Sequence, residues 1–240
     1  MLAIILVGGE ATRLRPLTLT MPKALIPLQG RPILEHVLDL FKEHNVTNVV
    51  LSIGYKKEQI RQYFGDGKRF GLSISYVEEP EPLGTAGFVH LLRQPIGETC
   101  VVCNGDELKD IDIPAMLSAH RQSGALGTIA LLKVDDPSPY GVARLDGTKI
   151  LEFVEKPKRE EAPSHYVNAG FYLLEPEVFT AIPKGRVMFE YDVFPRLAAA
   201  GKLHGFFFTG RWYDTGTPER LSRAEREWLG VPSRQTKKTK

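Results

Sequence analysis

The sequence predicts an α/β protein with a Rossmann-like, doubly wound, mixed but mainly parallel sheet that has helices on both faces. Two observations support this class. Apolar, strand-like runs alternate with helix-like runs through the first half of the chain, as crossovers between parallel strands require. The first run, residues 2–7, is apolar throughout, which is typical of a central strand covered on both faces.

The elements of the first half follow from this alternation. Residues 33–44 place their apolar side chains on one helical face, and Pro32 suits the first turn of that helix. Further strands are expected at residues 48–53, 72–77 and 99–104, and further helices at residues 56–64, 87–92 and 114–123.

The second half changes to successive strand-like runs, which predict an antiparallel or mixed extension of the same sheet. Asp146-Gly147 is a hairpin signal. Thr217 and Pro218 suit the N-cap and the first position of a C-terminal helix. The expected strands are residues 126–134, 141–145, 150–154 and 167–174, and the expected helices are residues 191–200 and 218–228.

Composition excludes several classes of protein. The 240 residues are 42% hydrophobic and 25% charged, which is ordinary globular usage. No apolar run approaches the ~18 residues of a membrane span, and residues 2–7 are too short for a signal-peptide core. We therefore expect a soluble, cytoplasmic protein without a membrane partner.

Basic residues gather in residues 231–240, which we interpret as a flexible, solvated tail. The rest of the chain offers no matching basic stripe with aromatic residues, so we expect no nucleic-acid partner. Cys100 and Cys103 lie in one strand-like run at an odd separation, which points their side chains to opposite faces. We expect both to be buried, reduced thiols.

The segment from residue 8 to residue 32 is long for a connection inside a compact domain, and such loops are usually functional. Gly8 and Gly9 follow directly on the first strand, so backbone amides there can approach a ligand closely. The segment also contains Arg13, Arg15, Lys23 and Arg31. Ligands of open α/β sheets bind at the carboxyl ends of the strands, so a polyphosphate fits this place. The alternative is a surface loop with solvated arginines, and the standard phosphate-loop and dinucleotide motifs are absent.

The order of residues in this loop resembles the signature of the nucleotide-sugar pyrophosphorylases, the sugar-1-phosphate nucleotidyltransferases. The matching stretches are Gly8-Gly9-Glu10-Ala11-Thr12-Arg13-Leu14-Arg15-Pro16-Leu17-Thr18 and Pro22-Lys23-Ala24-Leu25-Ile26-Pro27. The sequence departs from the family at Ala11, where glycine is usual, and at Ala24, where proline is frequent. If position 11 needs a positive φ, alanine there costs about 1 kcal/mol.

Further motifs follow in family order to about Thr217. They are Asn104-Gly105-Asp106, Glu155-Lys156-Pro157, Asn168-Ala169-Gly170 and Trp212-Tyr213-Asp214-Thr215-Gly216-Thr217. Each is weak alone, because an aspartate at a strand end is more often a cap or turn residue. Together they imply a Mg²⁺-dependent enzyme that transfers a nucleoside monophosphate from a triphosphate to a sugar 1-phosphate and releases pyrophosphate.

The resemblance also implies roles for particular residues. Arg13, Lys23, Asp106 and Asp214 are the expected catalytic residues, and the two aspartates are the expected Mg²⁺ ligands, since Mg²⁺ prefers carboxylate oxygen. The expected nucleotide-binding residues are Leu6, Gly8, Gly9, Arg13, Glu79, Gly84 and Thr85. The expected sugar-phosphate-binding residues are Gly141, Glu155, Lys156 and Asn168.

Glu79 stands where relatives that use uridine or thymidine triphosphate commonly have glutamine. An ionised carboxylate can accept from two adjacent donors, which guanine presents, so Glu79 favours GTP; an exposed loop glutamate is the alternative. Other motifs are more similar to the mannose-1-phosphate guanylyltransferases than to thymidylyl- or uridylyltransferases. Uridylyl, thymidylyl and heptose-1-phosphate specificities remain alternatives.

We expect a single nucleotidyltransferase domain over residues 1–230, with a nucleotide half at about 1–125 and a sugar-phosphate half at about 126–230. The partners are then small-molecule substrates, and homo-oligomer formation is left open. The rival from another class is a non-catalytic regulatory subunit with the same fold. The charged residues that the chemistry needs are all present, which favours the enzyme.

Overall fold

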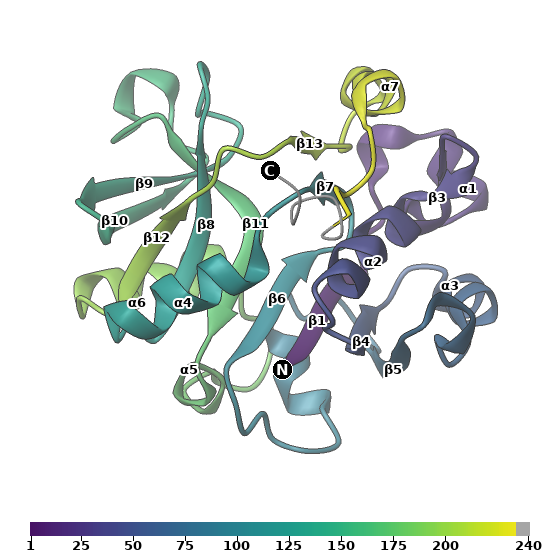
Figure 1. The fold of residues 1–240 in the computed structure, drawn as a ribbon, viewed down its shortest axis with the longest axis horizontal. Coiled ribbons are helices and arrows are strands. Elements are labelled where there is room, and N and C mark those ends of the chain that lie inside the picture. The colour runs from purple at the N-terminus through teal and green to yellow at the C-terminus, as the bar shows by residue number, and fades with distance from the viewer. Residues whose placement is uncertain (234–240) are drawn as a thin grey trace. The chain divides into compact units, whose positions relative to one another are not determined.

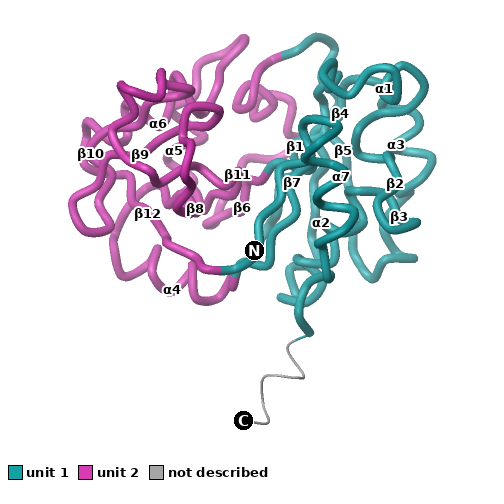
Figure 2. Tube along the Cα trace, turned by 90° about the horizontal axis from the view of Figure 1, so that it is seen from above, with its two compact units in different colours: residues 1–82, 104–111, 210–240 teal, residues 83–103, 112–209 magenta. Residues whose placement is uncertain are grey.

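The computed structural model describes residues 1–233, and residues 234–240 of the expected basic tail lie outside the described residues. The chain divides into two compact units, each built from segments far apart in sequence. Among the described residues, unit 1 contains residues 1–82, 104–111 and 210–233, and unit 2 contains residues 83–103 and 112–209 (Figure 2). The predicted boundary near residue 125 does not coincide with a division between these units.

Unit 1 contains three parallel strands, β1 (Leu2–Val7), β4 (Asn48–Ile53) and β5 (Ser73–Glu78), with β4 between the other two. Helix α2 (Ile33–Glu43) follows the loop after β1, and α3 (Lys57–Phe64) connects β4 to β5 (Figure 1). The apolar face predicted for the first helix is buried, including Ile33, Leu34 and Phe41. The alternation of strands and helices predicted for this part of the chain is confirmed.

Short elements complete unit 1. Strand β7 (Glu107–Lys109) pairs antiparallel with β13 (Trp212–Asp214), and β2 (Pro27–Leu28) pairs with β3 (Arg31–Pro32). Helix α1 (Leu17–Thr20) lies in the loop after β1. Helix α7 (Pro218–Glu227) begins as predicted, because the Thr217 hydroxyl oxygen accepts from the Arg220 N–H at 3.3 Å.

Unit 2 is mostly antiparallel. Strand β11 (Tyr166–Leu174) pairs antiparallel with both β6 (Cys100–Asn104) and β8 (Gly127–Lys133). Strand β12 (Leu203–Phe207) runs parallel to β8, and β10 (Lys149–Glu155) pairs antiparallel with β9 (Gly141–Asp146). The α/β class is confirmed, and parallel pairing predominates in unit 1 rather than across the whole chain.

The helices of unit 2 are α4 (Ile113–Ser123), α5 (Pro176–Thr180) and α6 (Phe194–Ala199). A π-helical turn at Phe189–Val193 replaces the start of the helix expected from residue 191. Phe189 and Phe194 stack with ring centroids 5.6 Å apart, and Tyr172 lies 4.8 Å from Phe194. Each fully buried aromatic side chain stabilises the fold by about 2–3 kcal/mol, so this cluster fixes the turn that carries Glu190.

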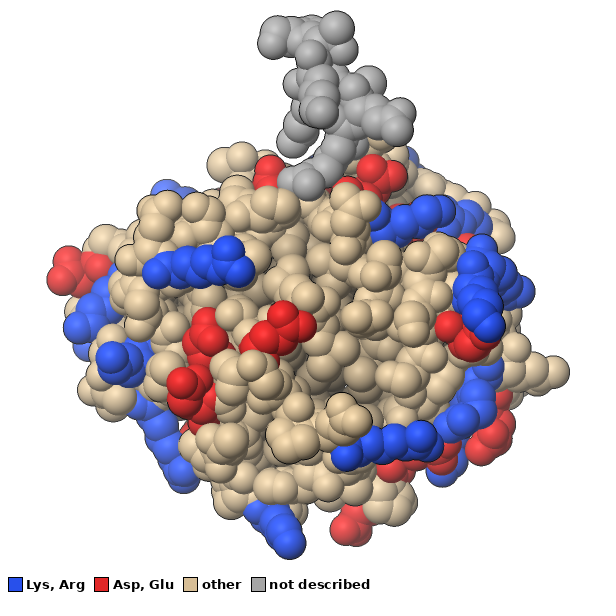
Figure 3. Space-filling view, turned by 60° about the horizontal axis from the view of Figure 1, so that its bottom comes forward, with Lys and Arg blue, Asp and Glu red and all other residues tan. Residues whose placement is uncertain are grey.

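Two further expectations, on the cysteines and on membrane-spanning helices, can be compared with the structure. Cys100 and Cys103 are both buried and form no disulfide, as predicted. Among residues 1–233, no helix is both long and apolar enough to cross a membrane. Figure 3 shows both basic and acidic side chains on one face, separated by uncharged surface.

Candidate active site

The loop after β1 is fixed in part by Ala11, one of the two residues that depart from the expected signature. Ala11 has φ 48° and ψ 51°, in the left-handed region, so the condition stated for its conformational cost is met. The Ala11 carbonyl accepts from the Leu14 N–H at 2.9 Å and from the hydroxyl of buried Thr18 at 3.2 Å. These bonds hold the short helical turn Thr12–Leu14, which carries Arg13, in place.

Arg13 is exposed and lies over the segment that follows β13. A Cβ atom placed on Gly216 would lie 2.9 Å from Arg13 Nη2, so the guanidinium packs closely against the backbone of residue 216. The Gly216 N–H donates to Asp214 Oδ1 at 2.7 Å. Arg13 and Asp214, both expected site residues, are therefore brought close together.

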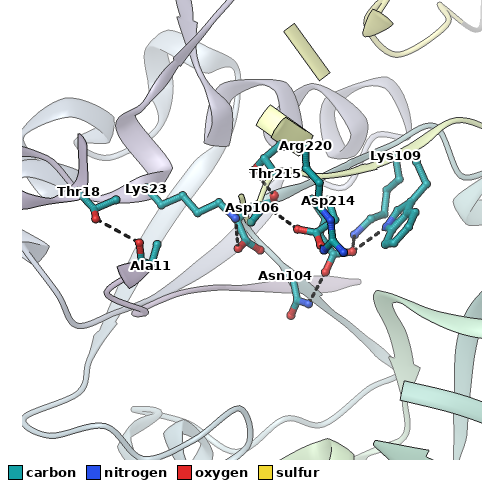
Figure 4. Close-up of polar contacts among 12 residues, drawn as sticks. Ala11, Thr18, Lys23, Asn104, Asp106, Lys109, Asp214, Thr215 and Arg220 are labelled. Carbon is teal, nitrogen blue, oxygen red and sulfur yellow. Dashed lines mark hydrogen bonds and ion pairs between the residues drawn. The ribbon is translucent and has the colours of Figure 1, made fainter. Parts of the chain in front are cut away.

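Lys23 and Asp106 form a direct ion pair. Lys23 comes from the 3₁₀ turn Lys23–Leu25 and is 6% exposed, and its Nζ lies 2.6 Å from Asp106 Oδ2 (Figure 4). Partial burial acts to raise the pKa of Asp106, but the charge and hydrogen bond of Lys23, aided by Lys109, lower it below the usual carboxyl value. The carboxylate therefore stays ionised and available to a cation.

Gly105 allows Asp106 to lie beside the end of β1. Its N–H donates to the Leu6 carbonyl at 3.0 Å, and a Cβ atom at residue 105 would collide with Val7 and lie 2.9 Å from Ile5 Cγ2. Leu6, an expected nucleotide-binding residue, thus supports this segment through its backbone.

Asp214 ends the short strand β13, opposite Glu107 of β7. Its side chain is 15% exposed and forms an ion pair with Arg220 of α7 (Figure 4). The next residue, fully buried Thr215, donates its hydroxyl to the Asp106 carbonyl at 2.7 Å. The segments that carry the two predicted metal ligands are therefore joined directly.

Glu107 is a site residue that the sequence analysis missed. Its carboxylate accepts from Asn104 Nδ2 and from Trp212 Nε1, both at 2.7 Å, and lies 3.6 Å from the ammonium group of Lys109. The sequence offers no signal for it, because its burial depends on a tryptophan in a distant three-residue strand.

Burial raises the pKa of Glu107, and Asp106 and Asp214 add to this effect while Lys109 opposes it. These three carboxylates pair with three cations, and we call the six residues the charge cluster. Its members are Lys23–Asp106, Lys109–Glu107 and Arg220–Asp214.

The charge cluster offers a divalent cation two carboxylates, Asp106 and Asp214, rather than a complete set of protein ligands. Within residues 1–233, no group of three or more His, Cys, Asp or Glu side chains is arranged to hold a metal ion. Mg²⁺ does not need such a group, since it usually binds one or two carboxylates together with substrate phosphates and water. Asp106 and Asp214, two hard-oxygen donors on joined segments, fit this mode of binding.

The expected base-reading residue, Glu79, lies beside the glycine turn in unit 1. Glu79 Oε1 accepts from the buried hydroxyl of Ser52 at 2.8 Å, and a Cβ atom on Gly8 would lie 3.5 Å from the same oxygen. The Gly8 carbonyl accepts from the Tyr55 N–H at 3.1 Å, which fixes the turn between Leu6 and Gly9. Gly8 and Glu79 are therefore brought together, as expected of one binding site.

Gly84 and Thr85 belong to unit 2. The turn before Gly84 is held by the Val187 N–H, which donates to the Leu83 carbonyl at 2.9 Å. The Thr85 hydroxyl donates to Glu190 Oε2 at 2.6 Å and accepts from the Phe189 N–H at 2.8 Å. Thr85 thus positions a buried carboxylate, and burial raises the pKa of Glu190 despite this hydrogen bond.

The expected sugar-phosphate residues also lie in unit 2. Gly141 begins β9 and faces Glu155 of β10 in the strand register, and Lys156 Nζ lies 3.0 Å from Glu155 Oε1. Partial burial acts to lower the pKa of Lys156, but the hydrogen bond and charge of Glu155 raise it, so the ammonium form persists.

Asn168 differs from these residues, because both its amide nitrogen and its amide oxygen form hydrogen bonds to residues of its own strand, β11. Its Nδ2 donates to the Tyr172 hydroxyl at 2.9 Å, and its Oδ1 accepts from the Gly170 N–H at 2.8 Å.

The parallel strands of unit 1 and the charge cluster beside them define an α/β protein with a group of paired charged side chains near strand ends. The chain belongs to the nucleotidyl transferase family, whose sequence model matches residues 2–229. The resemblance drawn from the loop motifs is therefore confirmed.

Sequence comparison with named proteins supports the same family assignment. The chain is 40% identical over 222 residues to a mannose-1-phosphate guanylyltransferase of Mycobacterium tuberculosis, covering 90% of this chain and 61% of that protein. It is 39% identical over 225 residues to the catalytic subunit beta of this enzyme from Danio rerio, covering 91% and 62%. The chain thus spans less than two thirds of the length of these relatives.

Solved structures share the fold. A Bacillus anthracis protein described as a glucose-1-phosphate thymidylyltransferase, in complex with a sucrose, matches with a TM-score of 0.83 and 28% identity, covering 94% of both chains. HddC from Yersinia pseudotuberculosis, complexed with GMP-PN, matches with a TM-score of 0.78 and 25% identity, covering 94% of this chain and 98% of that one.

Proposed function

We propose that this protein transfers the guanylyl group of GTP to mannose 1-phosphate, giving GDP-mannose and pyrophosphate. The observation that carries the proposal is the charge cluster, in which Lys23 and Asp106 pair at 2.6 Å beside the glycine loop and Arg13 lies over the Asp214 segment. The relatives named as mannose-1-phosphate guanylyltransferases support the choice of substrates.

In this reaction a phosphate oxygen of the sugar 1-phosphate attacks the α-phosphorus of GTP. The bond from that phosphorus to the bridging oxygen breaks, and pyrophosphate leaves with the electron pair. Both reactants are polyanions, so the protein acts mainly by positioning them and balancing charge. No general base is needed, because the nucleophile is already an anion.

The residues divide this work. Arg13 stabilises the departing pyrophosphate with its planar fork of donors. Lys23 contacts the phosphates at the reacting centre, and Lys156 receives the sugar phosphate. Asp106 and Asp214 would hold Mg²⁺, which supplies Lewis-acid neutralisation of phosphate charge when bound.

The choice of guanine depends on Glu79. Its Oε1 already accepts from Ser52, which fixes the carboxylate, and each carboxylate oxygen has two acceptor sites. The N1–H and exocyclic amine of guanine can therefore both donate to it, whereas the mixed edge of uracil or thymine cannot. The GMP-PN bound to HddC supports a guanine nucleotide.

The test is pyrophosphate release by the purified protein with Mg²⁺. GTP, UTP, dTTP, CTP and ATP are crossed with mannose, glucose and N-acetylglucosamine 1-phosphates. We expect turnover with GTP and mannose 1-phosphate, and none for Asp214→Asn with the same pair. Turnover with another pair would refute the assigned specificity. If no combination releases pyrophosphate, heptose 1-phosphates are tested as acceptors. The absence of turnover with these as well would favour the non-catalytic regulatory subunit.

A further inference from the structure

Arg220 occupies a position in the charge cluster that the sequence motifs do not assign. It lies in the first turn of α7, and its guanidinium pairs with Asp214, one of the two proposed metal ligands. The other proposed ligand, Asp106, pairs with Lys23 in the same way (Figure 4). Each proposed metal ligand thus has a cationic side chain at its carboxylate.

Local structure does not require this ion pair. The N-terminus of α7 is already capped by the Thr217 hydroxyl, and Asp214 Oδ1 is already held by the Gly216 N–H at 2.7 Å. The guanidinium binds the other oxygen, Oδ2. Its effect is to neutralise a carboxylate that is 15% exposed and lies near two further carboxylates.

We propose that Arg220 is a phosphate-binding residue that occupies the place of the metal on Asp214 until the metal and the nucleotide bind. This inference rests on the proposed function, because it assumes that a divalent cation and a nucleoside triphosphate bind at the charge cluster. A metal on Asp214 and the guanidinium compete for one carboxylate. The released guanidinium, with five donors in a planar fork, then binds phosphate oxygens of the nucleotide.

The charge balance supports the exchange. The ion pairs of the charge cluster cancel one another, so the cluster as described has no net charge to attract a triphosphate. A divalent cation adds two positive charges and frees a guanidinium beside Arg13, whose Nη2 lies near Gly216. Metal binding thereby converts a neutral cluster into a cationic one, which requires that metal and nucleotide strengthen each other's binding.

The experiment measures Mn²⁺ binding to the nucleotide-free protein, by the electron paramagnetic resonance signal of free Mn²⁺, and separately the KM for GTP. Arg220→Ala should bind Mn²⁺ about two- to five-fold more tightly, the range for losing a competing ion pair of this exposure. The KM for GTP should rise about ten-fold, because a charge-assisted phosphate contact is lost. Arg220→Lys should fall between Arg220→Ala and the wild type in both measurements.

Arg223→Ala is the matched control. Arg223 lies on the same helix, is exposed, pairs with Glu227 at 2.9 Å and lies over the Tyr213 ring, so its loss changes net charge equally while the ion pair on Asp214 is kept. Mn²⁺ affinity and KM should both stay at the wild-type values. Unchanged Mn²⁺ affinity in Arg220→Ala, or weaker binding, would overturn the inference, and so would an unchanged KM for GTP.

Asp214→Asn separates this inference from the proposed function. If Asp214→Asn binds Mn²⁺ as the wild type does, the metal assignment within the proposed function fails. If it loses Mn²⁺ while Arg220→Ala is unchanged, only the role of Arg220 fails. Arg220→Gln, which keeps the length and polarity of the side chain, replaces Arg220→Ala should the alanine variant unfold.

Discussion

Replacing Ala11 with glycine should stabilise the protein. Ala11 has φ 48° and ψ 51°, and an alanine in this left-handed region costs roughly 1–2 kcal/mol relative to the right-handed one. Glycine removes that cost but adds about 0.4–1 kcal/mol of conformational entropy to the unfolded chain. The expected net gain in the free energy of unfolding is therefore about 0.5–1 kcal/mol.

For a chain of this size, each kcal/mol shifts Tm by roughly 2–4 °C, so Ala11→Gly should raise Tm by about 1–4 °C in differential scanning calorimetry. The hydrogen bonds to the Ala11 carbonyl involve the backbone of residue 11 and remain available in the variant. Stability should rise without a change in the position of Arg13.

Ala119→Gly provides the control with the opposite sign. Ala119 lies inside α4 in right-handed helical conformation, where glycine costs about 1 kcal/mol. The same chemical change should therefore lower Tm there and raise it at residue 11. A Tm of Ala11→Gly that falls as far as that of Ala119→Gly would refute the left-handed conformation of Ala11 and the cost assigned to it.

Three further predictions concern the site. Asp106→Asn and Asp214→Asn should each reduce Mg²⁺-dependent turnover by at least about 100-fold with little change in Tm, since an amide keeps the shape but not the charge; near-normal turnover in either would contradict the metal assignment. Glu79→Gln should reduce the preference for GTP over UTP, measured as the ratio of kcat/KM values, by about ten-fold; an unchanged ratio would assign base reading to the backbone. Glu190→Gln should raise Tm at pH 7 and leave it unchanged near pH 4. Burial raises the folded pKa of Glu190, so the wild type is most stable below the ordinary carboxyl pKa and loses that stability as the pH rises through the raised value. A gap in Tm that stays constant from pH 4 to pH 8 would contradict this.

The loop after β1, and the membership of Lys23 and Asp106 in one site, could be predicted from the sequence. Glycines directly after an apolar strand place a loop at the carboxyl end of that strand, and the order of Arg13 and Lys23 resembles a known signature. The structure then places Lys23 Nζ 2.6 Å from Asp106 Oδ2 although the residues are 83 positions apart. The side chain of Asn168 bonds within β11, and its predicted contact with the sugar phosphate stays a prediction.

Asp214 could also be predicted from its motif, but the other members of the charge cluster, Glu107, Lys109 and Arg220, could not. Strands β7 and β13 have three residues each, too short to show any alternation of apolar and polar side chains. Glu107 is buried because it accepts from Trp212, and Arg220 meets Asp214 because α7 begins shortly after β13. The first contact depends on a strand pairing that no local pattern signals, and the second depends on the path of the chain between β13 and α7, so both become visible only in three dimensions.

Unit 1 is built from three segments that lie far apart in sequence, and this decides when during synthesis the site can form. The bond from Thr215 to the Asp106 carbonyl spans 109 positions, and Trp212 reaches Glu107 across 105. Because the ribosome delivers the chain from its N-terminus, Lys23 and Asp106 emerge long before β13 and α7 exist. A nascent or truncated chain that ends before residue 210 lacks the last segment of unit 1 and leaves Glu107 without Trp212. The charge cluster can therefore be completed only after residue 220 has been synthesised, and an unfinished chain that ends before residue 210 lacks both Asp214 and Arg220.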